Sequence, residues 1–178
     1  MKKIFVVLIL FSFLVGCESL NNTPTKRVEE LLNKYQTLDK KLLKDLDLVM
    51  EENDYTEEQK EKYKDIMKKQ YKDLVYVVKD EEINGDVATV KVEVEVYDYS
   101  NAITEANNFF MLNQNTFLDE NGQVDKTKYV DYKINLMKDM KERVKYTIEF
   151  VVRKKDDKWV LDGISDMDRE KIHGIYTY

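Results

Sequence analysis

An alternating run of apolar and polar residues over 87–97 constrains the fold of this chain more than any other feature. A period of two places the apolar side chains on one face of a β-strand and leaves the other face in water. Asn84-Gly85, a strong hairpin signal, precedes this run, and a β-branched stretch over 75–78 precedes the turn. The sequence therefore predicts an antiparallel hairpin whose apolar face must be covered by a second layer. The apolar positions of the run are Ala88, Val90, Val92, Val94 and Val96.

A second hairpin is predicted near the carboxyl end of the chain. Apolar and polar residues alternate again over 144–153, where Tyr146, Ile148 and Phe150 share one face. The charged stretch 154–158 predicts a hairpin loop, and the apolar stretch 159–164 predicts the last strand. The two hairpins together supply about four antiparallel strands.

Segments in which apolar residues have helical spacing lie before the first hairpin and between the two hairpins. Thr23-Pro24 is a helix start signal, and apolar residues at three- and four-residue spacing over 28–49 predict one long helix packed on the core. A coiled-coil seam is the alternative interpretation of the same stripe. Thr56 is the predicted cap of a second helix, with Gln59 at the capping-box position. Further helices are predicted from Ser100 or Asn101 to about 117, over 125–141 and over 166–173.

The order of these elements predicts the fold class. Two helices, a hairpin, two helices and a hairpin give a two-layer α+β domain over residues 24–178. We expect an antiparallel sheet of about four strands, with the helices on one of its faces. Each strand then has one polar face in contact with water.

The first 23 residues predict where the protein resides. Lys2 and Lys3 precede an apolar stretch over 4–15, which is the pattern of a signal peptide. Leu14-Val15-Gly16-Cys17 resembles the lipobox of bacterial lipoproteins. That resemblance implies cleavage after residue 16, acylation of Cys17, and a tether over 17–23 that holds the domain at the extracytoplasmic face of the cell membrane.

Both hairpins also carry a resemblance to a fold family. The Asn84-Gly85-Asp86 turn and the closing Lys158-Trp159-Val160-Leu161 stretch resemble small Gram-positive lipoproteins with an NTF2-like domain. The resemblance implies a curved antiparallel sheet that wraps around helices and leaves a cone-shaped cavity. The two helices predicted between 101 and 141 depart from the simplest version of that fold.

The residues that carry most catalytic chemistry are scarce. The only histidine, His173, stands near the carboxyl end, where a surface position is expected, and the only cysteine, Cys17, is assigned to lipid. A nucleophile needs a base, and a zinc site usually draws on several His and Cys. The five glycines are dispersed, so no phosphate-binding loop is present. We expect neither a cofactor nor a metal, and we expect a protein that is not an enzyme.

Acidic residues are plentiful, and carboxylates can act as metal ligands or as catalysts. Asp119, Asn121 and Asp125 stand close together, but Gly122 is at the fourth position rather than the sixth that an EF-hand loop requires, so a turn is predicted. The cluster Asp162, Asp166 and Asp168 is expected at a strand end and the following helix start. A formal net charge of −6 argues against nucleic acid as a partner.

Aromatic residues are the remaining candidates for a binding site. We consider two interpretations: an amphipathic pocket between helices and sheet for a small molecule or peptide, and an ordinary core, which is favoured. A non-catalytic binding or accessory lipoprotein is the predicted function, with an unidentified ligand or partner. A carboxylate-dependent hydrolase of envelope material and an immunity or structural lipoprotein are the alternatives. The pocket candidates are Tyr35, Tyr76, Phe110, Tyr132, Tyr146 and Trp159.

Overall fold

The computed structural model describes residues 22–51 and 54–177, so the predicted signal peptide, Cys17 and most of the tether lie outside the described residues. The elements in chain order are α1 (Pro24–Gln36), α2 (Lys40–Glu51), α3 (Glu57–Lys72), β1 (Val75–Asn84), β2 (Val87–Tyr97), α4 (Tyr99–Leu112), the 3-10 helix η2 (Gln114–Phe117), α5 (Lys126–Asp139), β3 (Arg143–Lys155), β4 (Lys158–Leu161) and α6 (Asp166–His173). This order confirms the predicted α+β class, with a curved and unclosed antiparallel sheet.

The four strands lie in the order β1-β2-β3-β4, and every pairing is antiparallel. The predicted first hairpin is confirmed: Asn84 pairs with Val87, and Gly85 takes the positive φ of 61° that such a tight turn requires. The second hairpin turns at Asp156 and Asp157, whose φ angles are 49° and 61°. Aspartate tolerates this left-handed region better than most residues, so two residues suffice for the turn. The loop is therefore shorter than the predicted 154–158, because Lys154 and Lys155 belong to β3 and Lys158 belongs to β4.

One face of the sheet forms the core. The alternating side chains of the two central strands are buried on this face, as the period of two predicts. The opposite face carries cross-strand ion pairs, among them Glu93 with Lys145 at 3.1 Å and Lys91 with Glu149 at 3.3 Å. The buried positions are Ala88, Val90, Val92, Val94, Val96, Tyr146, Ile148, Phe150 and Val152.

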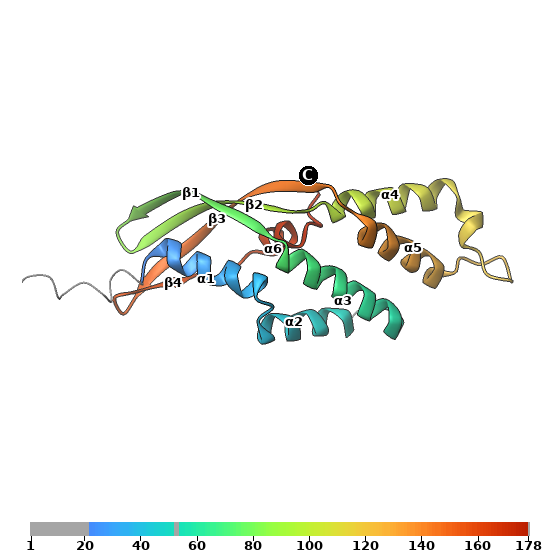
Figure 1. Cartoon of the computed structure of the whole chain (residues 1–178), viewed down its shortest axis with the longest axis horizontal. Helices are drawn as coiled ribbons and strands as arrows, with labels where there is room; N and C mark the ends of the chain where they lie inside the picture. Colours follow the sequence, from blue (N-terminus) through green and yellow to red (C-terminus); the bar gives the residue numbers. More distant parts are fainter. Residues whose placement is uncertain (1–21, 52–53, 178) are drawn as a thin grey trace, which may run out of the picture.

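Helices α1 and α6 cover the apolar face of the sheet. Helix α1 lies across all four strands, while α6 packs on β2 and on α3 near the end of the sheet where α4 begins (Figure 1). Val28 and Leu32 of α1 and Ile172 of α6 are fully buried in this layer. Each strand exposes only one face to water, so the other, apolar face must be covered by helices. This requirement gives the two-layer arrangement.

The expected single helix over 28–49 is wrong, because the chain breaks into α1 and α2. Leu38 adopts a φ of 54° between them, and the Thr37 hydroxyl donates to the Asn33 carbonyl at 2.7 Å. The Asp39 carboxylate accepts from the Lys41 backbone N–H at 2.9 Å, so Asp39 helps to start the new helix. Leucine is not a residue that favours a left-handed backbone, so its presence at position 38 does not predict the break.

Helices α4 and α5, joined by η2 and a turn, form a helical hairpin that extends past the end of the sheet (Figure 1). We call residues 99–139 the arm. Asp98 caps α4 by accepting from the Asn101 N–H at 3.1 Å, in place of the predicted Ser100 or Asn101 cap. The Asp119 carboxylate accepts from the backbone N–H groups of Asn121 and Gln123, both at 2.8 Å, so the predicted turn is confirmed.

Candidate binding surface on the helical arm

The six aromatic pocket candidates divide between two places in the structure. Tyr35 and Tyr146 are buried in the core between helices and sheet, and Tyr76 and Trp159 are half-buried against it. Phe110 and Tyr132 lie in the arm instead.

The four candidates between the helices and the sheet pack as parts of an ordinary hydrophobic core. The ring of Tyr35 packs edge-on against Tyr71 with centroids 5.1 Å apart, and the Tyr146 hydroxyl donates to the Tyr176 carbonyl at 3.0 Å. Burial raises the pKa of Tyr35, which is the expected effect on a phenol removed from water.

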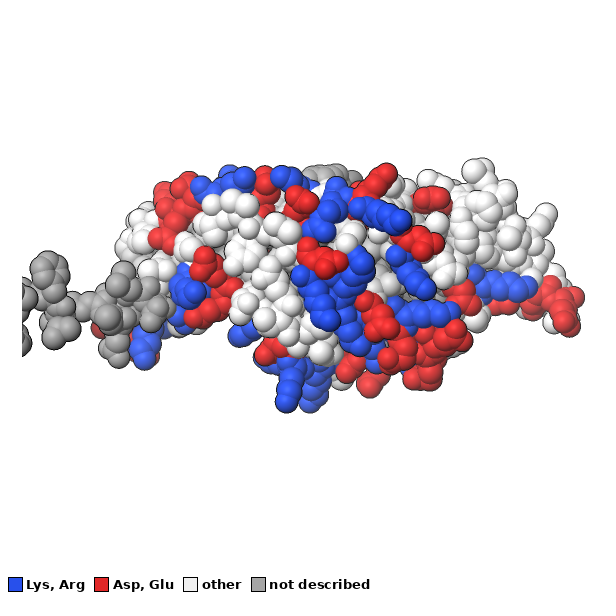
Figure 2. All heavy atoms as spheres, viewed as in Figure 1, with Lys and Arg blue, Asp and Glu red and all other residues white. Residues whose placement is uncertain are grey.

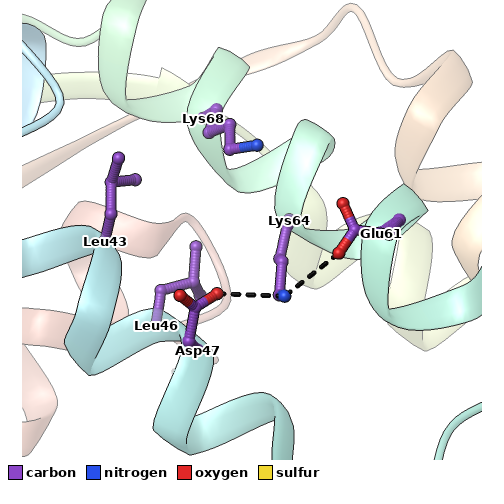
Figure 3. A pocket seen from close by; sticks show the side chains of 6 residues that line it. All are labelled: Leu43, Leu46, Asp47, Glu61, Lys64 and Lys68. Atoms are coloured by element: carbon purple, nitrogen blue, oxygen red, sulfur yellow. Dashed lines mark hydrogen bonds and ion pairs between the residues drawn. The ribbon is translucent and has the colours of Figure 1, made fainter. Parts of the chain in front are cut away.

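A hollow of about 250 Å³ lies between α2 and α3 (Figure 3). The Lys64 amine crosses it and pairs with Asp47 of α2 at 3.0 Å and Glu61 of α3 at 3.1 Å. The pair with Asp47 joins the two helices, and the two carboxylates together balance the charge of the amine. The remaining lining residues are Leu43, Leu46 and Lys68.

A second hollow of about 240 Å³ lies between α3 and the arm. Two of its three lysines are also partnered: Lys62 pairs with Glu58 at 2.7 Å, and Lys69 pairs with Asp73 at 2.9 Å. The same Lys69 amine lies 3.5 Å from the centroid of the Tyr97 ring. Neither hollow therefore offers a convergent set of unsatisfied polar groups of the kind that fixes a small ligand. The second hollow is lined by Lys62, Asp65, Ile66, Lys69, Tyr99 and Lys138.

The single histidine is not the surface residue that the sequence led us to expect. The His173 ring is partly buried beneath α3, and its Nε2 lies 3.0 Å from the Tyr71 hydroxyl. Burial, assisted by the nearby Arg169 charge, lowers the pKa of His173 to about 4. The imidazole is therefore neutral near pH 7 and has a phenol as its partner, an arrangement that suits packing better than proton transfer.

Among the described residues, the five carboxyls whose pKa departs from the usual value all have a lowered pKa. Lysine partners lower the pKa values of Glu57, Glu58, Asp73 and Glu93, and the pKa of Asp119 is lowered chiefly by a hydrogen bond from the Gln123 backbone. A carboxyl that donates a proton near pH 7 needs the opposite shift. Within residues 22–51 and 54–177 no three His, Cys, Asp or Glu side chains are grouped so that they could hold a metal ion.

The outer half of the arm holds a cluster of five aromatic rings. Phe117 lies at its centre with 3% of its surface exposed, and its ring is 5.5 Å from Phe110 and 5.7 Å from Tyr132 by centroids. Phe109 stacks 4.9 Å from Tyr132, and Phe110 lies 4.9 Å from Tyr129. Only Phe117 is buried, and the other four rings remain half-buried.

Apolar side chains are exposed beside this cluster. Met111 and Leu112 expose 68% and 84% of their surface at the end of α4. No charged residue occurs from Ala106 to Leu118, although 36% of the chain is charged. The surface around the end of α4 is accordingly white in Figure 2, whereas charged side chains crowd the surface over α3. An exposed apolar patch on a highly charged protein is a candidate interaction site.

The uncharged surface continues along α4. Helical geometry places Asn101, Thr104, Asn108, Met111 and Leu112 on one side of α4, opposite the buried Ala102 and Ala106. All five are exposed. We call these five residues the neutral stripe; Glu105 lies at its border. None of the predicted site residues except Phe110 lies near this stripe, although the absence of charged residues from 106 to 118 was a signal for it.

The arm lies at the end of the molecule opposite to the start of α1 (Figure 1). The side-chain oxygen of Asn22 accepts from the backbone N–H of Trp159 on β4 at 3.1 Å. This bond fixes the entry of the chain at the β4 end of the sheet. A membrane anchor a few residues before Asn22 would therefore lie far from the neutral stripe.

No family model, curated protein or solved structure matches this chain. The NTF2-like resemblance therefore stays a prediction. Along the described parts of the chain, no helix combines the length and the apolar character that crossing a bilayer requires.

Proposed function

We propose that the protein is a lipid-anchored extracytoplasmic lipoprotein whose role is binding rather than catalysis. The lipobox over 14–17 supports the anchor. The exposed, uncharged end of the arm supports the binding role, and this is the observation that carries the proposal. Asn22 and the arm lie at opposite ends, so an anchored molecule can present the arm away from the membrane.

The hydrolase alternative gains no support from this geometry. Its two carboxylates would have to converge in a cleft, and one would need a raised pKa. The acidic residues that line the two hollows, Asp47, Glu61 and Asp65, each pair with a lysine. The immunity or structural alternative agrees with the same anchor and arm, and it differs from our proposal only in the identity of the partner.

Cell fractionation of the full chain tests the anchor. Cys17→Ser removes the acylation site, so we expect this variant in the soluble fraction or retained with its leader at a larger mass. Ser19→Ala, two residues into the tether, is the matched control and should stay in the membrane fraction with the wild type. A Cys17→Ser chain that is cleaved at residue 16 and remains fully in the membrane fraction contradicts the proposal.

A further inference from the structure

We infer that the neutral stripe is where two copies of this chain associate, with their α4 helices side by side. The inference rests on the proposed function for the anchor and for the orientation of the arm. It goes beyond that function by naming the partner as a second copy. Three observations carry it: the charge of the whole chain, the residue types of the stripe, and its place in the molecule.

The first observation is electrostatic. The chain has a formal net charge of −6, so two copies repel each other over most of their surface. At a two-fold interface the residues near the axis meet their own copies, and any charged residue there faces an identical charge. The neutral stripe avoids this repulsion, whereas a partner of different sequence could have matched charges on this protein with opposite ones.

The second observation concerns the side chains themselves. The amides of Asn101 and Asn108 each contain a donor and an acceptor, so each can hydrogen-bond to its own copy across a two-fold axis. A pair of carboxylates or of amines cannot do so. A single asparagine in a helical seam is also a known means of fixing register between two identical helices. Met111 and Leu112 add the apolar surface that association removes from water.

The third observation is the direction of the arm. Helix α4 runs along the long axis of the molecule, away from the end where Asn22 enters (Figure 1). A two-fold axis parallel to α4 would keep both predicted anchors at the same end. Two copies on one membrane can therefore pair through this face without bending either arm.

Disulfide cross-linking of the full chain in bacterial membranes tests the inference. Met111→Cys places a thiol on the stripe, and Met167→Cys, on α6 with 53% exposure, is the matched control. After oxidation with copper phenanthroline we expect Met111→Cys to give a covalent dimer of twice the chain mass. The control should give about tenfold less, which corresponds to random collision on the membrane.

A second pair of substitutions shows whether the stripe itself drives the association. Asn108→Asp in the Met111→Cys background sets two carboxylates against each other and should lower the dimer yield about tenfold. Asn135→Asp, an exposed position on α5, adds the same charge to the other helix of the arm and should leave the yield unchanged. Both substituted side chains are exposed, so neither should affect folding, and equal membrane levels on an immunoblot confirm this.

Two outcomes overturn the inference. Equal dimer yields from Met111→Cys and Met167→Cys would show that the stripe is not a self-association surface. A Met111→Cys adduct with a protein of another mass, in place of the dimer, would also refute self-association, yet it would support a binding role for the arm. Fractionation of Cys17→Ser tests the anchor independently of both results.

Discussion

At the scale of single residues, Gly174 is the position where the structure tolerates no side chain. It ends α6 with a φ of 71°, and a Cβ there would overlap with the Tyr97 carbonyl oxygen and the Gln70 side-chain nitrogen. The Gln70 amide is itself fixed, because it donates to the carbonyls of Tyr97 and His173 and accepts from the Tyr97 N–H. The Gln70 side chain therefore cannot move away from a Cβ added at position 174 without breaking these hydrogen bonds.

We therefore expect Gly174→Ala to lower the free energy of unfolding by about 2–4 kcal/mol, since a clash adds to the strain of a positive φ. Gly85→Ala is the matched control, with a φ of 61° and no atom within 4 Å of the added Cβ, and it should cost about 1 kcal/mol. Urea unfolding followed by circular dichroism measures both. Equal losses from the two variants would contradict the packing described around Gly174.

His173 makes the stability of the fold depend on pH. Its pKa is about 4 in the folded chain and 6.5 in a free side chain, so the unfolded chain binds the proton more tightly. Its contribution to stability is complete above pH 6.5 and is lost as the pH falls toward 4. Between about pH 7 and about pH 5 we expect a loss of about 2 kcal/mol.

His173→Gln supplies the control for this prediction, because glutamine can still hydrogen-bond to the Tyr71 hydroxyl but does not titrate. Unfolding measured across the same pH range should be flatter for the variant than for the wild type. Identical pH dependence in the two chains would mean that other groups cause the loss.

At the scale of elements, Gln59 connects α3 to the arm. Its backbone N–H donates to the Thr56 hydroxyl at 3.2 Å and its side-chain oxygen accepts from the Thr56 N–H at 3.0 Å, which confirms the predicted capping box. The side-chain amide also donates to the Thr127 carbonyl at 3.0 Å and to the Asp131 carboxylate at 3.1 Å. One buried side chain thus starts α3 and holds the first turns of α5.

We expect Gln59→Ala to cost about 1–3 kcal/mol, because it removes a cap and leaves buried polar groups without a partner. The effect should be local, with faster amide hydrogen exchange in α5 and the start of α3 and unchanged exchange in β2 and β3. Gln114→Ala, at an exposed position of η2, is the control and should be neutral. Uniformly faster exchange over the sheet would show that the arm and the sheet open together.

At the scale of the whole molecule, net charge sets how association responds to salt. Two copies with a formal charge of −6 repel each other, and salt screens that repulsion without weakening apolar or amide contacts. We expect the Met111→Cys dimer yield to stay constant or rise between about 0.05 M and about 0.5 M NaCl. A yield that falls with salt would indicate ion pairs at the interface and would contradict a neutral stripe.

Local features of the fold could be predicted from the sequence. Alternation predicted β2 and β3, Asn84-Gly85 predicted the turn between β1 and β2, and Thr23-Pro24 and Thr56 marked the starts of α1 and α3. Each of these signals acts between residues that are near in sequence, so a period or a cap is enough to reveal it.

Other features depend on contacts between residues that are distant in the sequence, and only the tertiary structure reveals them. It bent the chain at Leu38, brought His173 against Tyr71, and placed the aromatic side chains in a core and an arm rather than around one pocket. It also left the neutral stripe uncovered at the end opposite Asn22. A pattern shows that a face is apolar or uncharged, but only the packing of the whole chain decides whether another element covers it.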